Sequence, residues 1–212
     1  MIKQARINFV DLPDEEPDSI LGQYTGAGAI FGATGGVMEA ALRTVADILT
    51  GKDLENFEYS DVRGLEGVKE ASVVLPIDGK DTEVKVAVAH GTANAAKVLD
   101  AVKRGEKEYH FIEVMACPGG CVHGGGQSHV SAKKRLDVNP KAKRADALYE
   151  LDRSLPLRKS HKNPEVIKLY EEFLKEPNGH ISHKYLHTHY YKRTPYELAQ
   201  EEEFEKLMEN LK

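Results

Sequence analysis

The 212-residue sequence has only two cysteines, no tryptophan and no apolar run long enough to cross a membrane. Two cysteines are too few for a small secreted domain built on disulfides, and the N-terminal residues lack the pattern of a signal peptide. There is also no excess of one charge, since 29 basic and 34 acidic residues give a net charge of −5. These absences lead us to expect a cytoplasmic protein that binds neither nucleic acid nor membrane.

Both cysteines lie in one glycine-rich segment, EVMACPGGCVHGGGQ at residues 113–127. Cys117 and Cys121 are four residues apart, with five glycines and one proline around them. Glycine allows the backbone to approach a bulky group closely. Thiolates are the usual ligands of soft metals and of iron–sulfur clusters, which normally need about four of them. The segment therefore predicts a cluster site to which this sequence contributes two ligands.

Spacing alone leaves two other interpretations of the cysteines open. They could be buried, inert thiols. They could also form a Cys2His2 zinc site with two histidines taken from His110, His123 and His129.

Two further patterns are weaker. The glycines of residues 26–36 suggest phosphate binding, but their spacing is not G-x-G-x-x-G and no strand runs directly into them. His180, His183 and His187 would share one face of a helix, which permits a metal site. We favour structural histidines, because no carboxylate or cysteine accompanies them.

Hydrophobic periodicity predicts an α/β fold with a mixed sheet flanked by helices. Strands are predicted over residues 5–10, 68–77, 82–90 and 109–115, and helices over 36–50, 92–103, 140–151 and 164–174. Asp78-Gly79 indicates a hairpin, Thr92 is a candidate N-cap, and Gly51 should end the first helix. Strand 109–115 should be buried on both faces, with Cys117 emerging from the end where open α/β sheets bind ligands.

Three stretches resemble the iron-only, or [FeFe], hydrogenases. The string at 113–127 is similar to the third cysteine signature of that family, and TGAGAIFGATGGVMEAALR at 25–43 resembles a second stretch of its catalytic domain. Residues 169–189 are similar to a segment that some members carry as a separate small subunit. The resemblance covers about residues 1–193. It implies a lobe of the catalytic domain at 1–138, a small-subunit-like helical belt at 139–193, and an acidic helical tail at 194–212.

The resemblance also implies a chemistry and a set of site residues. The reaction is the reversible oxidation of H2 to protons and electrons at an H-cluster, a [4Fe–4S] cubane joined to a diiron subcluster. Cys117 would ligate the cubane, and Cys121 would hold it and supply the bridging sulfur. Met115, together with Phe31, Gly32 and Val37, would line the diiron pocket.

The family's two other cysteine signatures, one like TSCCP and one like MPC, do not occur in this sequence. We therefore expect the chain to be inactive alone, and to need a chain that carries the other half of the catalytic domain. An exposed apolar patch around Phe31, Val37 and Met115 should bind that half or drive self-association. Electron-transfer partners would be ferredoxin or NAD(P)-linked subunits. The alternatives are a non-catalytic remnant, a structural subunit or a hydrogenase-like iron–sulfur assembly factor.

Overall fold

The computed structural model describes residues 1–16, 22–55, 58–77 and 79–190. It has two compact units, one ending at Asn163 and the other beginning at Pro164. In its described part the second unit contains α6 (Pro164–Leu169), a π-helical turn (Tyr170–Leu174) and α7 (His180–Leu186). The predicted tail at 194–212 lies outside the described residues. None of the described helices is long and apolar enough to cross a membrane.

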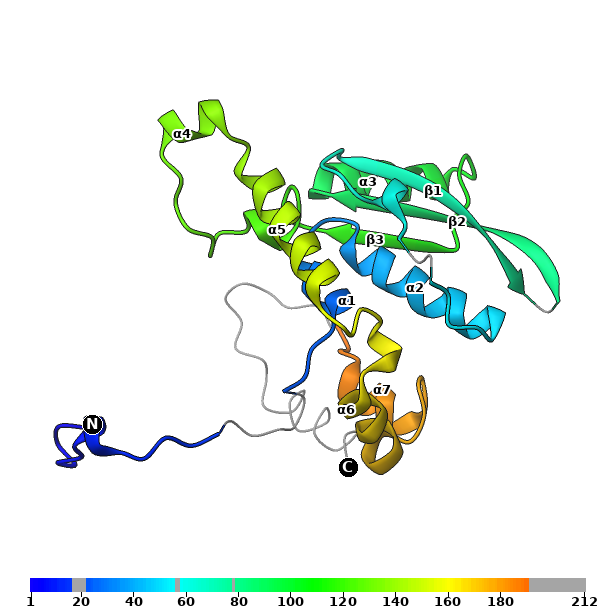
Figure 1. The fold of residues 1–212 in the computed structure, drawn as a ribbon. Helices are drawn as coiled ribbons and strands as arrows, with labels where there is room; N and C mark the ends of the chain where they lie inside the picture. Colours follow the sequence, from blue (N-terminus) through cyan, green and yellow to red (C-terminus); the bar gives the residue numbers. More distant parts are fainter. Residues whose placement is uncertain (17–21, 56–57, 78, 191–212) are drawn as a thin grey trace, which may run out of the picture. The chain divides into compact units, whose positions relative to one another are not determined.

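The first unit is built on a mixed three-stranded sheet in the order β1-β2-β3 (Figure 1). Its strands are β1 (Val68–Ile77), β2 (Lys80–His90) and β3 (Phe111–Met115). β1 and β2 form the predicted antiparallel hairpin, whereas β3 runs parallel to β2 with Val86 opposite Phe111. The parallel connection passes through α3 (Thr92–Lys103). The mixed sheet predicted from periodicity is confirmed.

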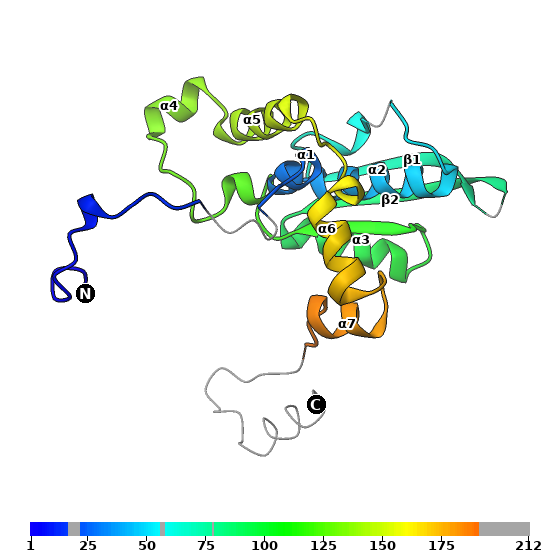
Figure 2. The ribbon, with the colours of Figure 1, turned by 60° about the horizontal axis from the view of Figure 1, so that its bottom comes forward.

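α2 (Gly36–Thr50) and α3 cover opposite faces of this sheet (Figures 1 and 2). The division follows the alternation of β2, because successive side chains of a strand point to opposite faces. Val84, Val86 and Val88 join the core cluster that includes α2, and Ala87 and Ala89 pack with Val98 of α3. One strand therefore supplies both hydrophobic layers.

α2 begins and ends as its sequence predicts. Gly35, with a φ of +91°, directs the chain into the helix, and Gly51, with a φ of +63°, ends it. The N-terminus is held by the buried carboxylate of Glu113, which accepts hydrogen bonds from Gly35 N and Met38 N at 2.7 Å each. A negative charge at this position also interacts favourably with the helix dipole.

Of the remaining helices of the first unit, the first packs on α2, the last packs against the first, and the middle one extends away from α2 (Figure 1). They are α1 (Gly26–Ala29), α4 (Ala132–Asp137) and α5 (Pro140–Ser154). Asn139 caps α5 by accepting hydrogen bonds from Lys141 N and Ala142 N, and Pro140 fits the first turn, which needs no amide donor. Tyr149 of α5 packs with Ile30 and Ala33, which attaches α5 to the glycine-rich segment.

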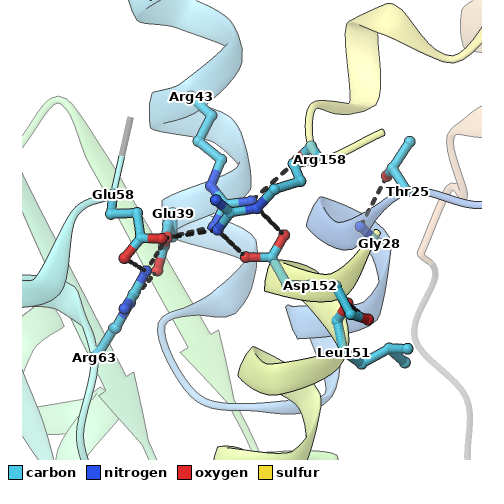
Figure 3. Close-up of polar contacts among 10 residues, drawn as sticks. Thr25, Gly28, Glu39, Arg43, Glu58, Arg63, Leu151, Asp152 and Arg158 are labelled. Carbon is cyan, nitrogen blue, oxygen red and sulfur yellow. Dashed lines mark hydrogen bonds and ion pairs between the residues drawn. The ribbon is translucent and has the colours of Figure 1, made fainter. Parts of the chain in front are cut away.

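A buried ionic network, the Glu39–Arg43–Asp152 network, joins α2 to α5 (Figure 3). Arg43 donates two hydrogen bonds of 2.8 Å to Asp152 and one of 2.6 Å to Glu39. All three side chains are fully buried. Arg158 also donates to Asp152, and Arg63 donates to Glu39. A buried charge is tolerated only when it is paired and hydrogen-bonded in this way.

Three local predictions were wrong. Residues 5–10 form no strand: they run through turns into a 3-10 turn at Phe9–Asp11, with every side chain exposed. A strand needs a hydrogen-bonding neighbour, and the described residues offer it none. Helix α3 is capped at Gly91 rather than Thr92.

The third wrong prediction concerns strand β3, which is shorter than predicted and is not buried on both faces. It begins at Phe111, and Phe111 and Val114 are 45% and 49% exposed. The cause is its position at the margin of the sheet, because among the described residues it has a strand neighbour, β2, on one side only.

We predict that Asp152→Asn lowers the free energy of unfolding by about 3–5 kcal/mol, because removing one partner leaves buried charge uncompensated. Burial alone would raise the pKa of Asp152, but hydrogen bonds from Arg43 and Arg158 lower it below its ordinary value. The stabilisation is therefore present above the unfolded-state pKa, and is lost as pH falls through the lower folded-state pKa. Urea denaturation from pH 7 downward measures both effects. The control is Glu106→Gln in an exposed ion pair, and equal losses in the two variants would contradict the prediction.

Candidate iron–sulfur site

The cysteine segment leaves the sheet at the carboxyl ends of its two parallel strands. His90 of β2 is paired with Met115 of β3, and Gly91 N donates a 2.8 Å hydrogen bond to Met115 O. Cys117 follows two residues later. Open α/β sheets bind their ligands at this edge. The structure therefore places the cysteines just beyond the carboxyl end of β3, as predicted.

The loop after Met115 folds tightly through two glycines. Gly120 N donates to Cys117 O at 2.9 Å, and a 3-10 turn follows at Cys121–His123. Gly119 and Gly120 have φ values of +90° and +94°, and Gly120 also has a ψ of −166°, a conformation essentially restricted to glycine. Only glycine at these positions permits the turn that separates the two cysteines.

The same glycines pack against the other glycine-rich segment. Thr34 N donates a 3.1 Å hydrogen bond to Gly119 O. A methyl group added at Gly120 would lie 2.8 Å from Gly32 O and 3.0 Å from Met115 Sδ. The two segments singled out from the sequence, some 80 residues apart, therefore touch at the site.

Besides the two cysteines, the four other predicted site residues differ in their burial and in their position relative to the cysteine loop. Gly32 and Met115 lie against the loop that carries the cysteines. Phe31 directly precedes Gly32 in the 3-10 turn Ile30–Gly32 and is 45% exposed, and Val37 is half-buried in the first turn of α2.

The thiols themselves are accessible. Cys121 is exposed and Cys117 is half-buried, and neither forms a disulfide. Beyond Cys121, a side chain added at Gly125 or Gly126 would meet no atom within 4 Å. Two free thiols beside an open glycine loop fit one side of a four-thiolate cluster and supply half of its ligands.

The zinc alternative receives no support from the geometry. His110 lies at the opposite end of β3 from Cys117, and its Nδ1 accepts a hydrogen bond from Lys85 N at 3.1 Å. In the described part of the chain, no three histidine, cysteine or acidic side chains are placed to bind a metal ion. At the end of α7, the ring of His183 stacks on that of His187, the residue after the helix, with 4.1 Å between the ring centroids.

Sequence reasoning missed two buried charged residues that hold the site together. Glu113 binds the N-terminus of α2, as described above. Lys69 of β1 is buried and donates hydrogen bonds to Thr34 O at 3.1 Å and to Gly64 O at 2.9 Å. Two sequence patterns could have revealed that these residues are buried. Lys69 stands on the same face of β1 as Ala71, Val73 and Leu75, and Glu113 stands in the middle of an apolar strand.

We predict that Gly120→Ala costs about 1–3 kcal/mol of stability from backbone strain alone, and more from the contacts with Gly32 and Thr34. Gly125→Ala is the matched control, because its backbone is not left-handed and its surroundings are empty. Guanidinium denaturation of the two variants measures the difference. Equal stability would show that the glycine loops do not pack as described.

The burial of Lys69 leads us to predict that the free energy of unfolding depends on pH. Burial lowers its pKa to about 8, with partial opposition from the charges of Glu113 and Glu66. The unfolded chain holds the same proton up to its ordinary pKa of 10.5, and so binds more protons between these values. The stability contributed by Lys69 should therefore rise from pH 8 to pH 10.5, by up to roughly 3 kcal/mol.

The measurement is the difference in unfolding free energy between the wild type and Lys69→Met at pH 7.5 and at pH 10. It should shift in favour of the wild type as pH rises. The difference between the wild type and Lys97→Met, an exposed position on α3, should stay constant. A constant difference for Lys69→Met as well would refute the assignment.

Comparison with known proteins agrees with this geometry. Residues 1–125 match the family described as iron only hydrogenase large subunit, C-terminal domain, and residues 138–193 match the iron hydrogenase small subunit. The NADP-reducing hydrogenase subunit HndD of Solidesulfovibrio fructosivorans is 49% identical over 193 residues, which make up 91% of this chain and 32% of HndD. A cytosolic Fe-S cluster assembly factor, narfl of Xenopus tropicalis, is 28% identical over 90% of this chain and 39% of its own length.

Among solved structures, a variant of the [FeFe]-hydrogenase HydA1 from Chlamydomonas reinhardtii aligns with a TM-score of 0.60 and 40% identity, over 89% of this chain and 52% of that chain. This chain therefore spans about a third of HndD and about half of HydA1. Because the large-subunit match alone covers more than half of its residues, the chain belongs to the iron-only hydrogenase family.

Proposed function

We propose that this chain forms the C-terminal part of an [FeFe] hydrogenase catalytic domain and contributes two thiolate ligands to its H-cluster. The supporting observation is the pair of free thiols on a glycine loop at the carboxyl end of β3, packed against the 32–34 segment. When bound, the cluster would supply the redox chemistry that interconverts H2 with two protons and two electrons. On this proposal, residues 1–138 are a lobe of that domain and 139–193 its small-subunit-like belt.

Each site residue has a separate task. Cys117 would hold the cubane, and Cys121 would hold it and provide the sulfur that joins it to the diiron unit. Met115, Phe31, Gly32 and Val37 would line the diiron pocket, where apolar contact keeps water away and backbone amides contact small polar ligands. The packing of Gly120 against Gly32 and Met115 supports a common pocket for these residues.

Two thiolates cannot close a site that needs about four. The other ligands would come from the part of the catalytic domain that has no counterpart here, since HydA1 is about twice as long as the matched region. Electrons would pass through ferredoxin or NAD(P)-linked subunits in the cytoplasm. The name of HndD as an NADP-reducing subunit supports the second of these carriers.

A non-catalytic role is the second candidate: a remnant, a structural subunit or an iron–sulfur assembly factor. The match to an assembly factor supports it. The identity to the hydrogenase subunit HndD is much higher, 49% against 28% over similar lengths, which favours the hydrogenase assignment.

We predict that the purified chain, reconstituted anaerobically with iron and sulfide, evolves no H2 from reduced methyl viologen. Co-expression with the complementary part of a hydrogenase catalytic domain and with maturation factors should give activity. In that complex Cys121→Ser should abolish turnover, because the bridging sulfur is lost, and Met115→Leu should retain a fraction.

Iron content and thermal stability of each variant complex show whether a loss of turnover is a loss of folding. Turnover by the chain alone would refute the requirement for a second half. Full activity in Cys121→Ser would refute the ligand assignment. Persistent inactivity of a correctly folded, iron-loaded complex would favour the non-catalytic alternative.

A further inference from the structure

Lys69 of β1 carries a buried positive charge that is bound only by neutral groups. The residue is 5% exposed, and its ammonium group donates hydrogen bonds to Thr34 O and Gly64 O. Within the described part of the chain, no acidic side chain forms an ion pair with it. Burying a charge without an opposite charge costs free energy. A neutral donor could bind the same two carbonyls at lower cost, so these hydrogen bonds alone do not account for a lysine here.

The charged groups around Lys69 do not neutralise it. Glu113 is separated from it by Val88 of β2, and the Glu113 carboxylate already binds the N-terminus of α2. Glu66, on the loop before β1, is exposed. Burial therefore lowers the pKa of Lys69 to about 8, and these two carboxylates offset the effect only in part. The other titratable groups of the surrounding elements are hydrogen-bonded elsewhere: Glu39 to Arg43 and Arg63, and His90 to Leu65 O.

A single residue connects Lys69 to the cysteine loop. The ammonium group donates to Thr34 O at 3.1 Å, and Thr34 N donates to Gly119 O at 3.1 Å. Gly119 stands midway between Cys117 and Cys121 in the sequence. A cluster held by thiolates is anionic, and at this loop it would supply the negative charge that Lys69 lacks.

A pocket beside the loop gives Lys69 access to protons. Thr34 and Gly64, the two residues that bind its ammonium group, line a pocket of about 330 Å³. Gly119 lines the same pocket, and α5 contributes the exposed side chains of Glu150 and Arg153. Lys69 is thus bound to the wall of a solvent-accessible space, from which its amine can exchange a proton as pH changes.

We propose that Lys69 is a positioning residue whose buried positive charge raises the reduction potential of a cluster held by the cysteine loop. The inference rests on the proposed function, because a cluster must bind at the two thiols. A nearby positive charge favours the reduced state, which carries one more negative charge than the oxidised state. In a protein interior, one unit charge a few residues away changes such an equilibrium by roughly tenfold. Substitution of Lys69 and its deprotonation at high pH should therefore have the same effect on the potential.

The test uses the 212-residue chain in complex with the complementary part of a hydrogenase catalytic domain, reconstituted with iron and sulfide and without maturation factors. The midpoint potential is measured by redox titration, followed by electron paramagnetic resonance, at pH 7 and at pH 10. At pH 7, Lys69→Met should raise the oxidised-to-reduced ratio at a fixed potential about tenfold, which equals a decrease of about 59 mV in the midpoint. At pH 10 the difference from the wild type should shrink, because the wild type also loses the charge.

Two further variants make the test specific. Lys69→Arg keeps the charge at both pH values, so it should retain the wild-type potential at pH 7 and lose the pH dependence. Lys97→Met is the matched control, because it removes an exposed lysine on α3, and it should leave the potential unchanged. Iron content and melting curves verify that each variant folds and carries the cluster.

An iron-loaded Lys69→Met complex with the wild-type potential would overturn this inference and leave the proposed function intact. An equal difference at pH 7 and pH 10 would also overturn it, because the effect would then be structural rather than one of charge. A complex that binds no iron would refute the proposed function, and this inference with it.

The free chain provides a check that needs no cluster. Competitive labelling of its amines with acetic anhydride, followed by mass spectrometry, measures the pKa of Lys69. The value should lie well below the ordinary 10.5. An ordinary value would show that the charge is not buried, and would overturn the inference independently of the proposed function.

Discussion

The arrangement of the site depends on the contact between Glu113 and the N-terminus of α2. Its carboxylate accepts hydrogen bonds from Gly35 N and Met38 N, and these amides have no partner inside the helix. Glu113 also lies two residues before Met115 and four before Cys117 in the sequence. This one side chain therefore sets the position of the glycine segment before α2 relative to the strand that leads to the cysteines.

The packing around this contact is close because glycines allow it. Gly120 reaches Gly32 and Thr34 in a backbone conformation that other residues rarely adopt. Lys69 donates a hydrogen bond to Thr34 O. The Glu39–Arg43–Asp152 network holds α5 against α2. The loops that would surround a cluster are thus held by buried polar contacts, which require specific geometry, in addition to the apolar packing of Tyr149 against Ile30 and Ala33.

The same geometry leaves one side of the site open. Both thiols are free, Gly125 and Gly126 have space around them, and within the described residues β3 pairs with a strand on one side only. These observations agree with a chain that spans about half of HydA1. The predicted apolar patch is present in part, since Phe31 is exposed, but Val37 and Met115 are half-buried.

The sequence by itself determined the elements whose signals are local. α2 and its final Gly51, the β1–β2 hairpin and the cysteine loop after β3 could all be predicted, because periodicity and glycine conformations depend on neighbours in the chain. Residues 5–10 alternate like a strand but remain unpaired, since pairing depends on a distant partner. Only the tertiary structure decided that β3 lies at the margin of the sheet formed by the described residues, and that Lys69 and Glu113 are buried. Their stability depends on acceptors and donors contributed by segments far away in the sequence, which no local pattern encodes.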